Sequence, residues 1–142
     1  MKLLNFIICD DIRNEIGNKL SLMGIYDSSI EFSVTPDQKD RWPKSLRIGI
    51  FVKIKLEKNE EVNKFQMRKK SNDKEVELGG GPLNIPHDKK EKTINIVMIN
   101  PNFIFEKPGN ITFSIDFYDN SGGVIKSLSP DMTIEVKEKI TN

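Results

Sequence analysis

The sequence predicts an all-β protein, a two-sheet antiparallel sandwich of the immunoglobulin-like or C2-like kind with eight to nine strands. Apolar residues recur at every second position in many short segments, which is the period of a strand with one buried face. Turn residues separate these segments at intervals of about ten residues, and no segment shows a convincing helical period. The 142 residues suit one domain, residues 1–142, which can fold without disulfides or metals.

The N-terminal third is expected to hold two or three strands. Residues 3–9 alternate in a way that leaves both faces apolar, so this strand is either covered on both sides or meets a partner. Residues 10–18 are interpreted as a polar connection that ends in the turn Gly17-Asn18. A strand is expected at 19–26, and it either continues past a kink at 27–29 or is followed by a third strand at 30–34. A loop follows at 35–44, and either residues 35–42 or residues 10–16 could hold one helical turn.

The strongest alternation runs from Leu46 to Leu56, where a helix would scatter the apolar positions around its circumference. We therefore expect a central strand there, followed by a strand at 62–70. Residues 79–82, a Gly-Gly-Gly-Pro sequence, are expected to break the chain before a loop at 83–91. A buried strand at 93–99, a turn at 100–102, a three-stranded meander over 105–136 and a polar tail complete the prediction.

Composition and charge argue against several classes of partner. The chain carries 22 Lys and Arg against 21 Asp and Glu, so no net field attracts nucleic acid or an anionic membrane. The first apolar run is broken by Asn5 and stops at Asp10, unlike a secretion signal. No segment approaches the roughly 20 apolar residues of a membrane span. With its one cysteine, the chain is predicted to be cytoplasmic.

No catalytic, metal or cofactor motif is present. The single histidine, His87, lies in a Pro- and Lys-rich loop without a nucleophile motif, and 79–82 lacks the Lys-Ser/Thr of a phosphate loop. The basic strip Lys64, Arg68 and Lys70 has acidic neighbours and no interleaved aromatic residues, which disfavours nucleic-acid binding. Two alternatives stay open: a small metal-dependent hydrolase built on Asp10, Asp11 and His87, and a calcium-dependent membrane-binding sandwich.

The most distinctive stretch is Cys-Asp-Asp-Ile-Arg-Asn-Glu at 9–15, followed by Asn-Lys-Leu-Ser-Leu-Met-Gly-Ile-Tyr at 18–26. It resembles the N-terminal signature of an uncharacterised family of small bacterial proteins, and residues 106–113 resemble the same family's C-terminal strand entry. The resemblance implies a compact β domain of bacterial or phage origin. It does not indicate any particular activity. It marks Asp10, Asp11, Arg13 and Glu15 as a candidate functional loop.

The same four residues could instead be an ion-paired loop that fixes a crossover between sheets. In either case, Arg13 is expected to pair with a nearby carboxylate.

The function favoured by these observations is a non-catalytic binding or assembly module with an unidentified protein partner. Its basis is the lack of a catalytic constellation together with apolar residues that remain on second strand faces. The candidate interface residues are Leu3, Ile7 and Phe51. Since monomers rarely leave such a patch open to water, we hypothesise a homodimer.

Overall fold

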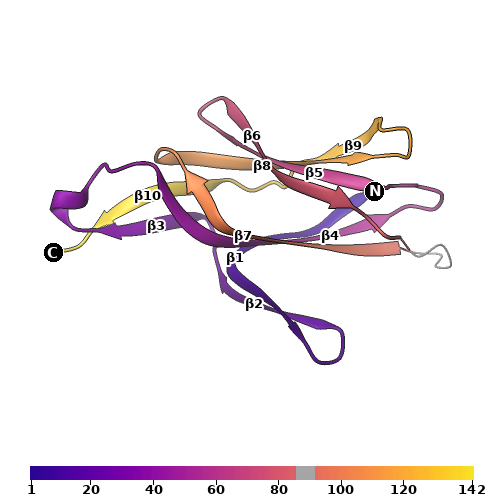
Figure 1. The fold of residues 1–142 in the computed structure, drawn as a ribbon, viewed down its shortest axis with the longest axis horizontal. Helices are drawn as coiled ribbons and strands as arrows, with labels where there is room; N and C mark the ends of the chain where they lie inside the picture. The colour runs from indigo at the N-terminus through magenta and orange to yellow at the C-terminus, as the bar shows by residue number, and fades with distance from the viewer. Residues whose placement is uncertain (86–91) are drawn as a thin grey trace.

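The computed structural model describes residues 1–85 and 92–142 and shows an all-β fold of two sheets packed against each other (Figure 1), as predicted. Sheet A contains, in spatial order, β2 (Lys19–Ile25), β1 (Lys2–Glu15), β4 (Lys44–Leu56) and β7 (Lys92–Phe105). Sheet B contains β3 (Ser29–Val34), β10 (Ile134–Ile140), β8 (Gly109–Tyr118), β5 (Lys64–Ser71) and β6 (Lys74–Pro82). A further strand, β9 (Val124–Leu128), pairs with β8, and a short 3₁₀ helix, η1 (Pro36–Gln38), precedes β4.

The core lies between β4 of sheet A and β8 of sheet B. The alternation predicted for residues 46–56 is confirmed, since Ile50, Val52 and Ile54 are buried on the inner face of β4. The matching inward residues of β8 include Ile115 and Phe117, which are fully buried. Each such side chain contributes about 1.5–3 kcal/mol to folding. No helix among the described residues is long and apolar enough to cross a membrane.

Three strands run through segments that we expected to interrupt them. β7 continues past Asn100-Pro101 to Phe105. A shift in the β4–β7 register between Leu46 and Ile48 accommodates this segment, and an edge strand tolerates the missing backbone N–H of Pro101. β6, also an edge strand, includes Gly79–Pro82, where the chain break was predicted, with a register shift in β5 opposite Gly79. β10 extends through the expected polar tail to Ile140 because it pairs in parallel with β3.

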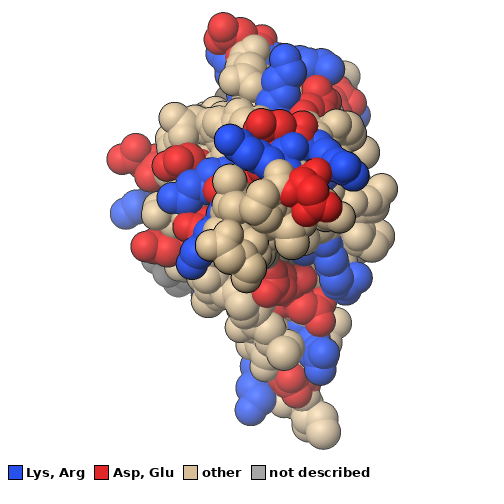
Figure 2. Space-filling model, turned by 90° about the vertical axis from the view of Figure 1, so that its left-hand side faces the viewer, with Lys and Arg blue, Asp and Glu red and all other residues tan. Residues whose placement is uncertain are grey.

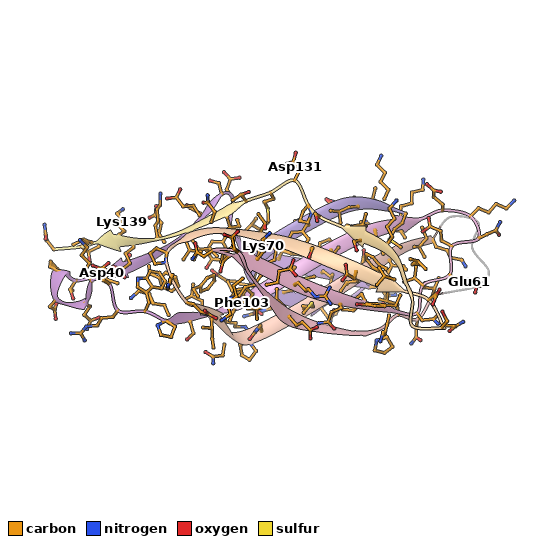
Figure 3. All side chains as sticks on the ribbon, turned by 90° about the horizontal axis from the view of Figure 1, so that it is seen from above. Asp40, Glu61, Lys70, Phe103, Asp131 and Lys139 are labelled. Carbon is orange, nitrogen blue, oxygen red and sulfur yellow. The ribbon has the colours of Figure 1, made fainter. Side chains whose placement is uncertain are left out.

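The predicted C-terminal meander is only half right. β9 forms a hairpin with β8, pairing Tyr118 with Val124, but β10 returns to the other end of β8 and pairs Ile111 with Ile134. β9 and β10 therefore lie end to end along one edge of β8. Residues 129–133 bow outward between them, with Asp131 at the margin in Figure 3, and open a hollow of about 310 Å³.

One core position is cationic. Lys69 is only 5% exposed, and its ammonium donates to the carbonyl of Ile104 and lies 4.7 Å from the centre of the Phe103 ring. Burial lowers the pKa of this lysine. Lys69 lies between Arg68 and Lys70 of the basic strip in the sequence, but the inward alternation Phe65, Met67 makes residue 69 the next inward position of β5.

The loop that precedes β4 closes one end of the sandwich. Trp42 packs edge-on against Phe32 with ring centroids 5.7 Å apart, and Lys44 forms a 3.5 Å ion pair with Glu138. Figure 3 shows Asp40 at this end and Glu61 at the opposite one. The Trp42 region therefore packs against β3.

Candidate interaction surface

The candidate functional loop is a strand. Residues 10–15 continue β1 and pair with β2, from Asp11 opposite Met23 to Glu15 opposite Lys19. A three-residue turn joins the strands, with positive φ angles of 90° at Gly17 and 57° at Asn18. The outer half of the hairpin projects from the two layers into solvent (Figure 1). Its residues are therefore polar, and a polar segment predicts a loop when only the sequence is considered.

Three residues of the recognised signature meet at the base of this hairpin. The Tyr26 hydroxyl donates to the Asp10 carboxylate, which lies directly over Gly24. Gly24 has a φ of 66°, and a Cβ at this position would lie 2.8 Å from Cγ of Asp10. Burial and the bond to Asp10 raise the pKa of Tyr26 to about 12. The glycine and the tyrosine of the signature therefore shape the hairpin.

Asp11 joins the hairpin to the central strand. Its carboxylate accepts hydrogen bonds from Arg47 of β4 at 3.0 Å and from Arg13 at 3.2 Å, and these bonds lower the pKa of Asp11. The expected pairing of Arg13 is confirmed. Both arginines are exposed, so the ion pairs contribute little to stability. Glu15 lies exposed next to the hairpin turn.

The outer face of sheet A carries two adjacent rows of apolar residues. Strand register places Ile7, Phe51 and Val97 in one row across β1, β4 and β7. The next row runs from Ile25 of β2 through Cys9 and Gly49 to Ile99 of β7. We call the exposed or half-buried apolar members of these rows the outer patch: Ile7, Ile25, Phe51, Val97 and Ile99.

Strand alternation places Leu3 and Cys9 on the same face as Ile7, but neither residue belongs to the outer patch. The β1–β4 register shifts between Leu3 and Asn5, which turns Leu3 inward opposite Ile54, so its place in the candidate interface is wrong. Cys9 is fully buried. Its sulfur lies against Gly49, where a Cβ would stand 3.2 Å away.

The carboxylates of Asp116 and Asp119, which a calcium site at this end of β8 would need, are bonded within the protein. Asp119 accepts from the Ser121 hydroxyl at 2.6 Å and from the Gly123 N–H at 3.1 Å, and these bonds lower its pKa. Asp116 accepts from Ser127 at 2.5 Å and pairs with Arg68. Within residues 1–85 and 92–142, no three His, Cys, Asp or Glu side chains gather around a possible metal position. His87 lies outside the described residues.

The predicted basic strip is interleaved with acids. Arg68 pairs with Asp116 of β8 and approaches Glu77 of β6 at 3.6 Å, while the Lys64 ammonium lies 4.9 Å from the centre of the Tyr118 ring. Figure 2 shows positive and negative side chains intermixed on the face it presents, including the narrow extension below the body.

A comparison with protein-family models matched residues 4–126 to a family of unknown function (DUF6941). A search of curated proteins found no match.

Proposed function

Since the chain belongs to the DUF6941 family of unknown function, we propose its role from its own residues: a non-catalytic binding or assembly module. Its interaction surface is the outer patch of sheet A. The observation that carries this proposal is the exposure of large aliphatic side chains in the two rows on that face. Val97 of the first row is 43% exposed, and Ile25 of the second row is 60% exposed. Monomeric proteins rarely leave contiguous apolar patches of more than a few hundred Å² open to water.

The surroundings of the outer patch support the proposal. On one side lies the row Asn5, Lys53 and Asn95, and on the other the ion pair of Asp11 with Arg47. An apolar centre with a polar rim is the usual composition of a protein–protein interface. Phe51, at the middle of the first row, is the aromatic residue best placed to act as an anchor.

The engagement of the two aspartates also favours binding over hydrolysis. Asp10 accepts the Tyr26 hydroxyl, and Asp11 accepts from two arginines. A carboxylate with a lowered pKa that is held by two guanidinium groups is a poor general base near neutral pH.

A pair of matched variants tests the proposal. Ile25→Lys places a charge on the outer patch, and Val124→Lys places one on β9 of sheet B, where Val124 is 56% exposed. Each tagged protein is used to capture partners from an extract of its host, with quantitative mass spectrometry as the readout. We expect Ile25→Lys to lose proteins that the wild type and Val124→Lys retain. Equal capture by all three would exclude the outer patch as the interface.

A further inference from the structure

We infer that a second copy of this chain pairs with the free edge of β7, so that the two four-stranded sheets A become one continuous sheet. This inference rests on the proposed function, because both assume that sheet A contacts other chains. The proposed function concerns the outer face of sheet A, whereas this inference names a second copy of the chain as the partner at its β7 edge.

Residues 93–99 of β7, before Pro101 and the register shift, lack the features that keep a strand from pairing with another chain. Within the described part of the chain, β7 pairs with β4 alone and ends sheet A. Residues 93–99, Thr-Ile-Asn-Ile-Val-Met-Ile, contain no charge, no proline and no glycine. An edge strand normally carries such residues because its unpaired N–H and C=O groups otherwise recruit a further strand.

Several other strand edges carry charges or a bend. β6 carries Lys74, Glu75 and Glu77 and then the Gly79–Pro82 segment. β3 is six residues long and carries the charged Glu31. β2, at the opposite edge of sheet A, is bent at Gly24 and follows the projecting hairpin. Residues 93–99 of β7 therefore form a long edge segment without charge, proline or glycine.

The chemistry of β7 fits a second copy of itself. In an antiparallel pair centred on Ile96, Ile94 lies opposite Met98 and Asn95 opposite Val97 of the other copy, so apolar or uncharged groups meet at each position. Lys92 then lies opposite Asn100, and no like charges face each other directly. Such a pair has two-fold symmetry, which closes the assembly at two copies. It also brings the Val97 residues of both outer patches close together, which enlarges the apolar surface for a further partner.

The first test follows mass and backbone protection together. The wild type is measured by light scattering over a range of micromolar concentrations, and amide hydrogen exchange of residues 93–99 is recorded over the same range. We expect the mass to rise from 16.3 kDa toward twice that value, with slower exchange of these amides in step. A monomer throughout, or a dimer in which this exchange stays independent of concentration, would overturn the inference.

Two matched variants separate the edge from the face. Asn95→Lys adds a charge at the β7 edge, whereas Asn5→Lys adds the same charge in the same cross-strand row on β1, two strands away from that edge. Both asparagines are exposed, so both variants should fold. We expect Asn95→Lys to weaken dimerisation by about tenfold or more and Asn5→Lys to leave it unchanged.

Equal effects of the two variants would contradict edge pairing. Protection of residues 93–99 that appears only when host extract is added would also overturn the inference, since a foreign strand would then occupy the edge. The two proposals fail separately: a monomeric wild type whose partner capture is still lost in Ile25→Lys leaves the proposed function standing.

Discussion

Replacing Gly24 with alanine tests whether the most distinctive stretch of this sequence shapes the hairpin. At a φ of 66°, an alanine would adopt the left-handed conformation, which destabilises the folded state by about 1–2 kcal/mol. The new methyl group would also overlap the Asp10 carboxylate and displace it from the Tyr26 hydroxyl. A hydrogen bond to a charged acceptor at this solvent-exposed site contributes about 1 kcal/mol. We expect Gly24→Ala to lower the free energy of unfolding by about 2–3 kcal/mol.

The hairpin turn supplies the control. Gly17 also has a positive φ, 90°, but a Cβ there would meet nothing within 4 Å, so Gly17→Ala should cost only the backbone penalty. Urea unfolding of both variants measures the difference. Spectrophotometric titration adds an independent readout, because displacing Asp10 should bring the pKa of Tyr26 down from about 12. If the two variants cost the same and the titration of Tyr26 is unchanged, the contact of Asp10 with Gly24 has no energetic role.

Three further outcomes are expected. Burial lowers the pKa of Lys69, so between that pKa and 10.5 the folded state binds fewer protons than the unfolded state. The free energy of unfolding, measured by urea titration, should therefore rise with pH over this range. Lys69→Met should remove this rise. The pKa of Tyr26 is raised above 10.0, so its contribution to stability is complete below pH 10 and lost as pH approaches about 12. Tyr26→Phe should abolish this alkaline loss and the late step in absorbance; persistence of either would show that another group titrates. Ile50→Asp buries a charge in the core and should lower the free energy of unfolding by several kcal/mol. Circular dichroism should then show no cooperative thermal transition. A normal transition would place Ile50 outside the core.

Local pattern was sufficient for the fold class and for the core. The two-residue period of β4 and of β8 identifies both central strands and their buried faces without any knowledge of partners. The Gly17-Asn18 turn likewise marks the hairpin between β1 and β2. These features depend on residues that are close in the chain, so the sequence displays them directly.

The candidate surface depended on pairings that the sequence does not display. Leu3 was misassigned because a one-residue register shift in β1 turns its side chain to the other face. The polarity of residues 10–15 predicts a loop, but it reflects the exposure of a hairpin in which these residues pair with β2. Ile7 and Phe51 were correctly placed on second faces, but only the register with β7 adds Val97 to their row.

Local periodicity was therefore enough to identify the central strands with a buried face and the β-sandwich class. Only the folded chain shows which strands lie at the edges, which faces remain uncovered, and that Lys69 lies inside. The physical reason is that burial of an apolar side chain is written into local periodicity, whereas strand order and register are set by backbone hydrogen bonds between distant residues. Those bonds join the same N–H and C=O groups whatever the side chains are, so the sequence carries little record of which strands they connect.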